Sequence, residues 1–397
     1  MRESATQECA VTVSASSAKV TRIRVAFFLP SLNGGGAERA AVNLLRGLDK
    51  NRFHPTLILK RKEGSLLNEM PDDIEIIELD TDSYRGVLIS SWLLRRVLRD
   101  VRPQLVVSFL NQCNVCALLA GALSLRRYKL IISVRNSLKA KFSNRSKPKR
   151  ILKELFVKRV YGQADHIISV SDGVANELVE KFNLLRSKIT TIHNPLDVKR
   201  IRRLSKANAP VREWAGKEKV IVAAGRLVQQ KGFSDLIEAL AIIRRSTPAK
   251  LIILGDGPLK GKLKGLADDL GVAQSVLLPG FVENPWAWIS KSDVFVLSSH
   301  WEGLPAVLIE AMACGVPIVA TDCDFGPREY VDPGVHGYLI QPGDIQGLAS
   351  TVKAVLGDPL TSVQFVKNGL ERAMQFESSK ACQNFERVFE RIVGGAS

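Results

Sequence analysis

The stretch Glu302-Gly-Leu-Pro-Ala-Val-Leu-Ile-Glu310 predicts a sharp turn that carries one carboxylate and a helix that carries a second. The apolar run 294–298 before it is typical of a buried strand, and the turn residues that follow end that strand. Pro305 suits the first position of a helix, because its missing N–H group would be unpaired there in any case. Gly315 favours the end of the same helix. The sequence therefore predicts a strand–turn–helix unit.

Glu302 and Glu310 are predicted to approach one ligand from two sides. Glu302 lies in the turn, beside the exposed N–H groups and partial positive charge of a helix start, where anions bind. Glu310 lies about one and a half turns into the helix, so its carboxylate can reach the same ligand from beneath. In the alternative, Glu302 only caps the helix and Glu310 faces solvent. Because the neighbours of Glu310 are almost all apolar, we expect its carboxylate to have a partner.

The two halves of the chain repeat one pattern, in which short apolar strands alternate with helices. This pattern predicts an α/β fold of two doubly wound, Rossmann-like domains that face each other across a cleft. The N-terminal domain is expected over 22–200 and the C-terminal domain over 201–378, with a polar linker at 197–219. Residues 1–21 are expected to form a flexible leader that is not a signal peptide. The predicted strands are 24–29, 56–59, 74–77, 105–109, 130–134, 167–170, 220–224, 251–254, 276–278, 294–297 and 318–320, and the predicted helices include 37–48, 91–101, 235–243 and 261–270.

Glycine-rich turns follow the first predicted strand of each half, where α/β sheets bind their ligands. The loop Gly34-Gly-Gly36 lets backbone N–H groups approach a ligand, but it lacks the Gly-x-Gly-x-x-Gly pattern of a dinucleotide site. In the second half, Gly225-Arg226 and Lys231-Gly232 flank a turn whose two cations are suited to neutralise a diphosphate. The alternative is a turn that carries ordinary surface charges.

The composition is typical of a globular protein, with 46% hydrophobic residues, and 397 residues allow two domains. The longest apolar run, 115–125, is far shorter than the roughly 18–20 residues that cross a bilayer.

Six scattered cysteines indicate a reducing compartment. Cys113-Asn-Val-Cys116 has the spacing of a redox pair at a helix start, and the alternative is two buried thiols. No histidine pair or second cysteine pair supports a metal site, so we expect none.

The net charge of +16 is concentrated in residues 1–200, which carry +15 of it. Residues 126–160 hold 13 basic residues and one acid, Glu154, with apolar residues at helical spacing beside them. We interpret this stretch as a basic amphipathic element for an anionic membrane surface or a lipid-linked acceptor. The alternatives are a solvated face and a nucleic-acid site, and no base-reading motif accompanies the stretch. The residues assigned to the basic patch are Arg126, Arg127, Lys139, Lys141, Arg145, Lys147, Lys149 and Arg150.

Together these motifs resemble the retaining, nucleotide-sugar-dependent glycosyltransferases of the GT-B fold, of the family 4 / group 1 type. The resemblance covers about residues 22–390 and rests on the glycine loop, the turn 225–232, Gly255-Asp-Gly257 and the Glu302-x7-Glu310 motif. It implies that a helix over 379–393 packs back onto the N-terminal domain and that the reaction needs no cofactor and no metal ion.

The resemblance also implies roles for the matching residues. Cleavage of the sugar–phosphate bond builds positive charge on the sugar carbon and negative charge on the diphosphate, which cations and helix N-termini stabilise. Configuration is retained through attack on the same face, with the leaving phosphate accepting the acceptor's proton. The implied donor residues are Glu302 for the sugar, Glu310, Gly255 and Asp256 for the ribose and base, and Arg226, Lys231, Gly35 and Gly36 for the diphosphate.

The chain departs from the family after the predicted strand 130–134. Many relatives have a histidine there, whereas this chain has Arg135-Asn136, so we expect one of these residues to replace it near the reacting sugar. Glu329 is expected near the donor sugar or phosphate, and His193 is expected to be structural. The Arg-Asn pair and the segment around Glu329 look most like hexosaminyl- and galactosyl-type members that act on lipid-linked or polysaccharide acceptors.

The expected activity is therefore transfer of a hexose or N-acetylhexosamine, from a UDP-sugar in preference to a GDP-sugar, to a lipid-linked or polysaccharide acceptor in cell-envelope glycan synthesis. The expected place is the cytoplasm, peripheral on the inner face of the cytoplasmic membrane. One alternative is a sugar-nucleotide epimerase or a phosphorylase of the same architecture. The other is a basic nucleic-acid-binding protein, which leaves the two glutamates without a role.

Overall fold

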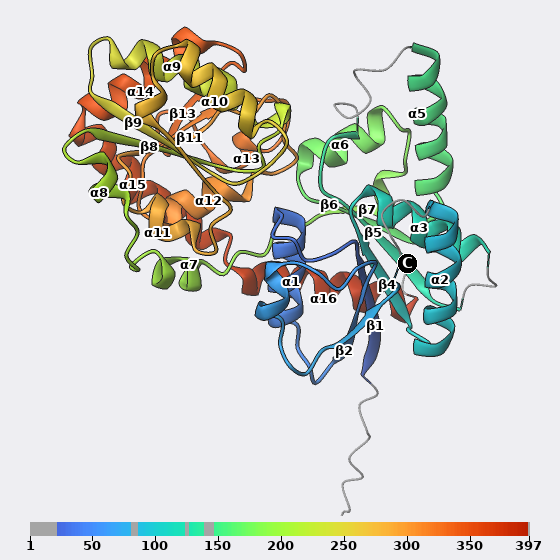
Figure 1. Ribbon diagram of the computed structural model, residues 1–397. Coiled ribbons are helices and arrows are strands. Elements are labelled where there is room, and N and C mark those ends of the chain that lie inside the picture. Colours follow the sequence, from blue (N-terminus) through green and yellow to red (C-terminus); the bar gives the residue numbers. More distant parts are fainter. Residues whose placement is uncertain (1–21, 81–85, 124–126, 139–146, 396–397) are drawn as a thin grey trace, which may run out of the picture.

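The computed structural model describes residues 22–80, 86–123, 127–138 and 147–395 (Figure 1). Two parallel sheets with helices packed against them form two lobes, which are joined by the chain around α7 (Val198–Leu204). The prediction of two doubly wound α/β units is therefore confirmed. The expected leader 1–21 lies outside the described residues.

The first sheet has seven parallel strands in the order β3-β2-β1-β4-β5-β6-β7. Its connectivity reverses between β1 and β4, which makes their carboxyl ends the switch point where open α/β sheets bind ligands. The strands are β1 (Ile23–Leu29), β2 (Phe53–Leu59), β3 (Glu75–Glu78), β4 (Leu105–Phe109), β5 (Lys129–Val134), β6 (His166–Ser169) and β7 (Ile189–Thr191). The helices of this lobe are α1 (Gly36–Gly47), α2 (Val87–Val101), α3 (Asn111–Ala122), α5 (Lys147–Tyr161) and α6 (Asp172–Glu180).

The second sheet has six parallel strands in the order β10-β9-β8-β11-β12-β13, with its own switch point between β8 and β11. The strands are β8 (Lys219–Ala224), β9 (Ala249–Leu254), β10 (Val276–Gly280), β11 (Val294–Leu297), β12 (Ile318–Thr321) and β13 (Gly337–Ile340). The helices are α9 (Phe233–Arg244), α10 (Lys260–Asp269), α11 (Pro285–Ile289), α12 (Ala306–Ala313), α13 (Pro327–Tyr330), α14 (Ile345–Gly357) and α15 (Pro359–Gln375).

The segment expected to be a polar linker, 197–219, contains two short helices, α7 and α8 (Val211–Ala215). The side chain of Asp197 accepts a hydrogen bond from the Arg200 N–H and so caps α7, while Val198 and Ile201 are buried. Helix α7 packs against both α11 and α12. The connection between the lobes is therefore itself part of the packed structure.

The last helix, α16 (Ser378–Gly394), leaves the second lobe and packs on α1 of the first, as Figure 1 shows in red. Its apolar residues recur at helical spacing and form one buried face. The ring of Phe389 lies edge-on to Phe27 and Phe53, with centroids 6.2 and 6.0 Å away. Buried Glu386 accepts a hydrogen bond from the Asp49 N–H at 2.9 Å. The N-terminal core thus includes the end of the chain.

We predict that Phe389→Ala lowers the free energy of unfolding of the N-terminal lobe by about 3–5 kcal/mol, because it opens a cavity among three aromatic rings. Urea unfolding followed by fluorescence measures the change. Arg387→Ala, an exposed position on the same helix, is the matched control and should leave the midpoint within experimental error. Equal midpoints for both variants would contradict the assignment of α16 to this core.

Candidate functional site

The carboxyl ends of β8 and β11 bring two predicted site residues together. Lys231 lies in the turn after β8 and Glu302 in the turn after β11, and their Nζ and Oε1 atoms are 2.6 Å apart. Gly232 makes the approach possible: its φ is +58°, and a Cβ there would lie 2.0 Å from the carbonyl oxygen of Ser298. Any larger residue would push the two turns apart. The switch point of the second sheet thus holds an ion pair whose carboxylate is buried and whose ammonium group is half-buried.

Glu302 is only 5% exposed and its charge is well compensated. Besides Lys231, the hydroxyl of Ser299 donates to its Oε1 at 2.7 Å. Its carboxylate does not cap α12, because no side chain caps the N-terminus of that helix and Pro305 stands at the N-cap position, one residue before the predicted place. The capping alternative for Glu302 is therefore not supported.

Glu310 lies in α12 and is 9% exposed. The indole Nε1–H of Trp286 donates to its Oε2 at 3.0 Å. The expectation that a carboxylate in this apolar setting has a partner is confirmed. The sequence does not point to Trp286 as that partner, because Trp286 lies on a different helix and carries no motif.

The first-lobe loop 34–36 faces the second lobe. A Cβ on Gly34 would lie 3.1 Å from the ring of Phe281, and one on Gly35 would lie 2.3 Å from Oε2 of Glu38. A Cβ on Gly36 would meet nothing within 4 Å. Burial raises the pKa of the Glu38 carboxyl, against the opposing effects of a backbone hydrogen bond and of the charge of Arg226.

Arg226 itself is exposed in the turn after β8, and its charge acts on Glu38 in α1, the helix that begins at Gly36. The turn with Gly255 and Asp256 packs against the Gly225 turn: a Cβ on Gly255 would lie 2.0 Å from the Gly225 oxygen. Asp256 is exposed at this edge, where its Oδ1 accepts the Gly257 N–H at 2.7 Å.

Arg135, at the end of β5, is buried where the first lobe meets the turn that carries Glu302. A Cβ on Gly303 would lie 2.2 Å from the Arg135 carbonyl oxygen. The guanidinium donates to Oδ1 of Asn194 and lies 4.9 Å from the ring centroid of Phe109. Burial lowers the pKa of Arg135 to about 10, and its Nε and Nη2 have no hydrogen-bond partner within the described part of the chain. Asn136 follows and is exposed.

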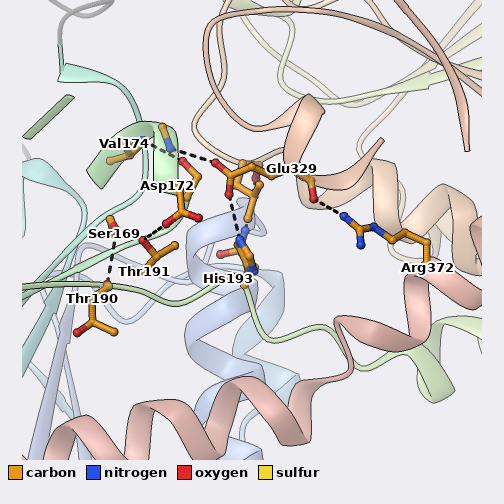
Figure 2. Close-up of polar contacts among 12 residues, drawn as sticks. Ser169, Asp172, Val174, Thr190, Thr191, His193, Glu329 and Arg372 are labelled. Carbon is orange, nitrogen blue, oxygen red and sulfur yellow. Dashed lines mark hydrogen bonds and ion pairs between the residues drawn. The ribbon is translucent and has the colours of Figure 1, made fainter. Parts of the chain in front are cut away.

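Glu329 bridges the two lobes, a role that the sequence did not indicate. Figure 2 shows its carboxylate between the N-terminus of α6 and His193: Oε1 accepts the Gly173 N–H at 3.1 Å, and Oε2 is 3.0 Å from His193 Nε2. Arg372 donates to the backbone carbonyls of Glu329 at 2.8 Å and of Tyr330 at 3.2 Å, which fixes α13 in place. In this arrangement both oxygens of Glu329 already have partners on the first lobe.

The basic patch is described only in part. Arg127 is exposed. The others lie outside the residues whose side chains are described: Arg126, Lys139, Lys141 and Arg145 in undescribed segments, and Lys147, Lys149 and Arg150 in the first turn of α5. The redox interpretation of Cys113 and Cys116 loses its support, because both thiols are buried and burial raises their pKa, the reverse of what a reactive thiolate needs.

Known protein families match this chain along most of its length. The family described as "Glycosyltransferase Family 4" matches residues 34–200, and the one described as "Glycosyl transferases group 1" matches residues 205–372.

Two relatives and one solved structure illustrate the similarity. The chain is 28% identical to the N-acetylgalactosamine-N,N'-diacetylbacillosaminyl-diphospho-undecaprenol 4-alpha-N-acetylgalactosaminyltransferase of Campylobacter jejuni subsp. jejuni serotype O:2, over 91% of this chain and 98% of that protein. It is 30% identical to the lipopolysaccharide 1,6-galactosyltransferase of Escherichia coli, over 49% of this chain and 54% of that protein. The crystal structure of Anabaena HepE in complex with UDP and glucose shares the fold, with a TM-score of 0.78 at 20% identity over 93% of this chain and 100% of that one.

We predict that Glu329→Ala loosens the contact between the lobes and lowers the free energy of unfolding by about 1–3 kcal/mol, because it leaves the Gly173 N–H without its acceptor. Hydrogen exchange should speed up at the first turn of α6 while the core strands stay protected. Glu371→Ala, an exposed position on α15, is the control and should change neither quantity. Unchanged exchange in Glu329→Ala would show that the bridge is not formed in solution.

Proposed function

Because the chain belongs to the glycosyltransferases of the group 1 / family 4 type, we propose that it moves a hexose or N-acetylhexosamine from a UDP-sugar to a lipid-linked or polysaccharide acceptor in cell-envelope glycan synthesis. The contact between Lys231 and Glu302 is the main structural support for this proposal. The switch point of the second sheet holds a cation and a carboxylate, Lys231 and Glu302, in direct contact and nearly buried. In a nucleotide-sugar donor the diphosphate would pair with the cation, and the hydroxyls of the attached sugar would donate hydrogen bonds to the carboxylate.

The chemistry follows from where charge develops. As the sugar–phosphate bond breaks, Lys231 and the exposed guanidinium of Arg226 stabilise the departing diphosphate, with help from the backbone N–H groups of Gly35 and Gly36. Glu302, which is paired with Lys231 and accepts a hydrogen bond from Ser299, accepts further hydrogen bonds from sugar hydroxyls and orients the ring. The acceptor attacks on the same face and loses its proton to the leaving phosphate, so configuration is retained. In this scheme no metal ion is required.

Arg135 and Asn136 have separate roles in this proposal. Arg135 packs its backbone against Gly303 and so holds the turn that presents Glu302. Asn136, which follows β5 and is exposed, is proposed to contact the sugar or the acceptor. Glu310 is proposed to bind the ribose hydroxyls, and the exposed Asp256 turn is proposed to lie near the base.

The comparisons support the choice of donor and acceptor. The UDP base is supported by the likeness to a structure that contains UDP. The lipid-linked acceptor is supported by the relative whose name includes diphospho-undecaprenol, which matches over nearly its whole length. An epimerase, which acts on a free sugar nucleotide, has no need of such an acceptor.

An anionic membrane surface on the inner face of the cytoplasmic membrane is proposed as the place of action. Helices α2 and α5 both pack on α3 and expose large apolar residues, among them Trp92 at 49% and Leu155 at 59%. Exposed arginines accompany them, and Arg96 lies 4.8 Å above the Trp92 ring. No helix among the described residues is long and apolar enough to cross a bilayer. Apolar side chains framed by cations match an anionic lipid surface.

We predict that UDP, with or without EDTA, raises the melting temperature of the purified chain, whereas GDP does so less. A ligand at about a hundred times its dissociation constant adds roughly 2.7 kcal/mol of stability, which a melting curve detects. Glu310→Ala should abolish the shift. No shift with any nucleotide would overturn the proposed donor site, and a shift that EDTA removes would overturn metal independence.

We predict that Lys231→Met lowers kcat by about 100- to 1000-fold, because the leaving diphosphate loses a preorganised charge. Release of UDP from a panel of UDP-sugars in the presence of lipid-linked acceptors measures the rate, and NMR of the product measures the anomeric configuration. Lys262→Met, an exposed lysine on α10, is the matched control. Equal rates in the two variants, or an inverted product, would contradict the mechanism.

We predict that the chain sediments with vesicles that contain phosphatidylglycerol but not with pure phosphatidylcholine vesicles, and that Trp92→Ser together with Leu155→Ser reduces the bound fraction by about tenfold. Leu360→Ser, at an even more exposed apolar residue on α15 of the other lobe, is the control. Binding that is the same for both lipids would argue against this surface.

A further inference from the structure

Trp286 connects a predicted ligand-binding carboxylate to the boundary between the lobes. It lies in the short helix α11, whose N-terminus is capped by Asn284, and it is 3% exposed. Its indole N–H is bonded to Oε2 of Glu310, and the other oxygen of Glu310 makes no hydrogen bond within the described residues. One carboxylate oxygen is therefore fixed by the protein, and the other remains for a ligand.

Two guanidinium groups from outside the second lobe lie over the indole ring. Arg39, from α1, has its Cζ atom 5.1 Å from the ring centroid, and Arg200, from α7, has its Cζ at 5.7 Å. Cations over an indole ring attract it electrostatically, and more strongly where water is excluded. The orientation of Trp286 thus depends on residues of the first lobe and of the connection.

Glu69 holds these two arginines together. It pairs with Arg39 at 3.5 Å and with Arg46 at 3.6 Å, and it accepts a hydrogen bond from Arg200. Although burial opposes the shift, the hydrogen bond from Arg200 and the neighbouring positive charges hold the pKa of the Glu69 carboxyl below its usual value. The three arginines would otherwise repel one another, so Glu69 is what lets two of them share one indole ring.

Arg39 and Glu310 also face each other across the boundary between the lobes. Both line a cavity of about 10 Å³, room for about one water molecule, together with Trp286 and Arg200. The cluster therefore runs without a break from Glu69 in the first lobe, through the two arginines and the indole, to the Glu310 carboxylate.

We propose that Trp286 is a positioning residue that orients the Glu310 carboxylate toward the donor ribose, and that Arg39 and Arg200 make this orientation depend on the docking of the two lobes. The inference rests on the proposed function, in which Glu310 binds ribose hydroxyls. Trp286, Arg39 and Arg200 lie outside the recognised motifs, yet in this proposal they orient the carboxylate that contacts the ribose. Separation of the lobes removes Arg39 from the ring and frees the carboxylate to rotate.

The test measures, by calorimetry on the full chain, the affinities for UDP and for 2′,3′-dideoxy-UDP. The analogue lacks the ribose hydroxyls that would donate hydrogen bonds to Glu310. The wild-type chain should bind UDP about tenfold or more tightly than the dideoxy analogue. Trp286→Phe, which keeps an aromatic ring and removes the N–H donor, should lose most of this preference by weakening UDP binding alone. Trp288→Phe, two residues along the same helix, is the matched control and should keep the preference.

A second variant guards against misfolding of the first. Arg39→Gln leaves Trp286 and Glu310 intact and should also reduce the preference, by a smaller factor. A wild-type chain that binds no nucleotide would overturn the proposed function and this inference with it. Tight UDP binding by the wild type, with the preference unchanged in folded Trp286→Phe or in Arg39→Gln, would overturn this inference alone.

Discussion

The ion pair between Lys231 and Glu302 sets the shape of the site, because it ties together two turns that belong to different strands of the second sheet. Removing two charges from water carries a large desolvation penalty, and a buried pair returns it only when further hydrogen bonds complete its geometry. Ser299 supplies one such bond, and Gly232 supplies the space. A pair of this kind is weak evidence for stability, and under the proposed function its part is to present a cation and an oriented carboxylate to the donor.

Charged side chains cross the boundary between the lobes, beside the apolar cluster that the two lobes share. Glu329 reaches into the first lobe for the Gly173 N–H and for His193, while Arg39 reaches into the second lobe for the Trp286 ring. These contacts cross in opposite directions on either side of the site. Polar contacts of this kind reform more readily than an apolar interface when two lobes separate and close. This property suits an enzyme that must admit a donor and release a nucleotide.

The sequence predicted those parts of the molecule in which local pattern and tertiary structure agree. The alternation of apolar strands and helices was enough for two doubly wound sheets, and the apolar surroundings of Glu310 were enough to require a partner for its carboxylate. The short strand β13 and the helices of the linker were not predicted, because four residues show no period and the polar residues of 197–219 are typical of coil. Trp286, Arg39 and Glu69 carry no motif, so only the folded chain reveals that they meet. The site residues taken from the resemblance remain predictions, and Glu329 has an observed contact that its motif did not suggest.

The return of α16 to the first lobe has a consequence for how the chain is made. Phe385 and Phe389 belong to the core beneath β1 and β2, yet they follow the whole second lobe in the chain. Domains of most multidomain chains fold in order as they emerge. Here the N-terminal core stays incomplete until α16 has been made, while the second lobe, β8 to α15, has its whole sequence available earlier. A nascent chain therefore exposes the unfinished apolar surface of its first lobe throughout the synthesis of its second, and a ribosome that stalls before α16 leaves that surface uncovered.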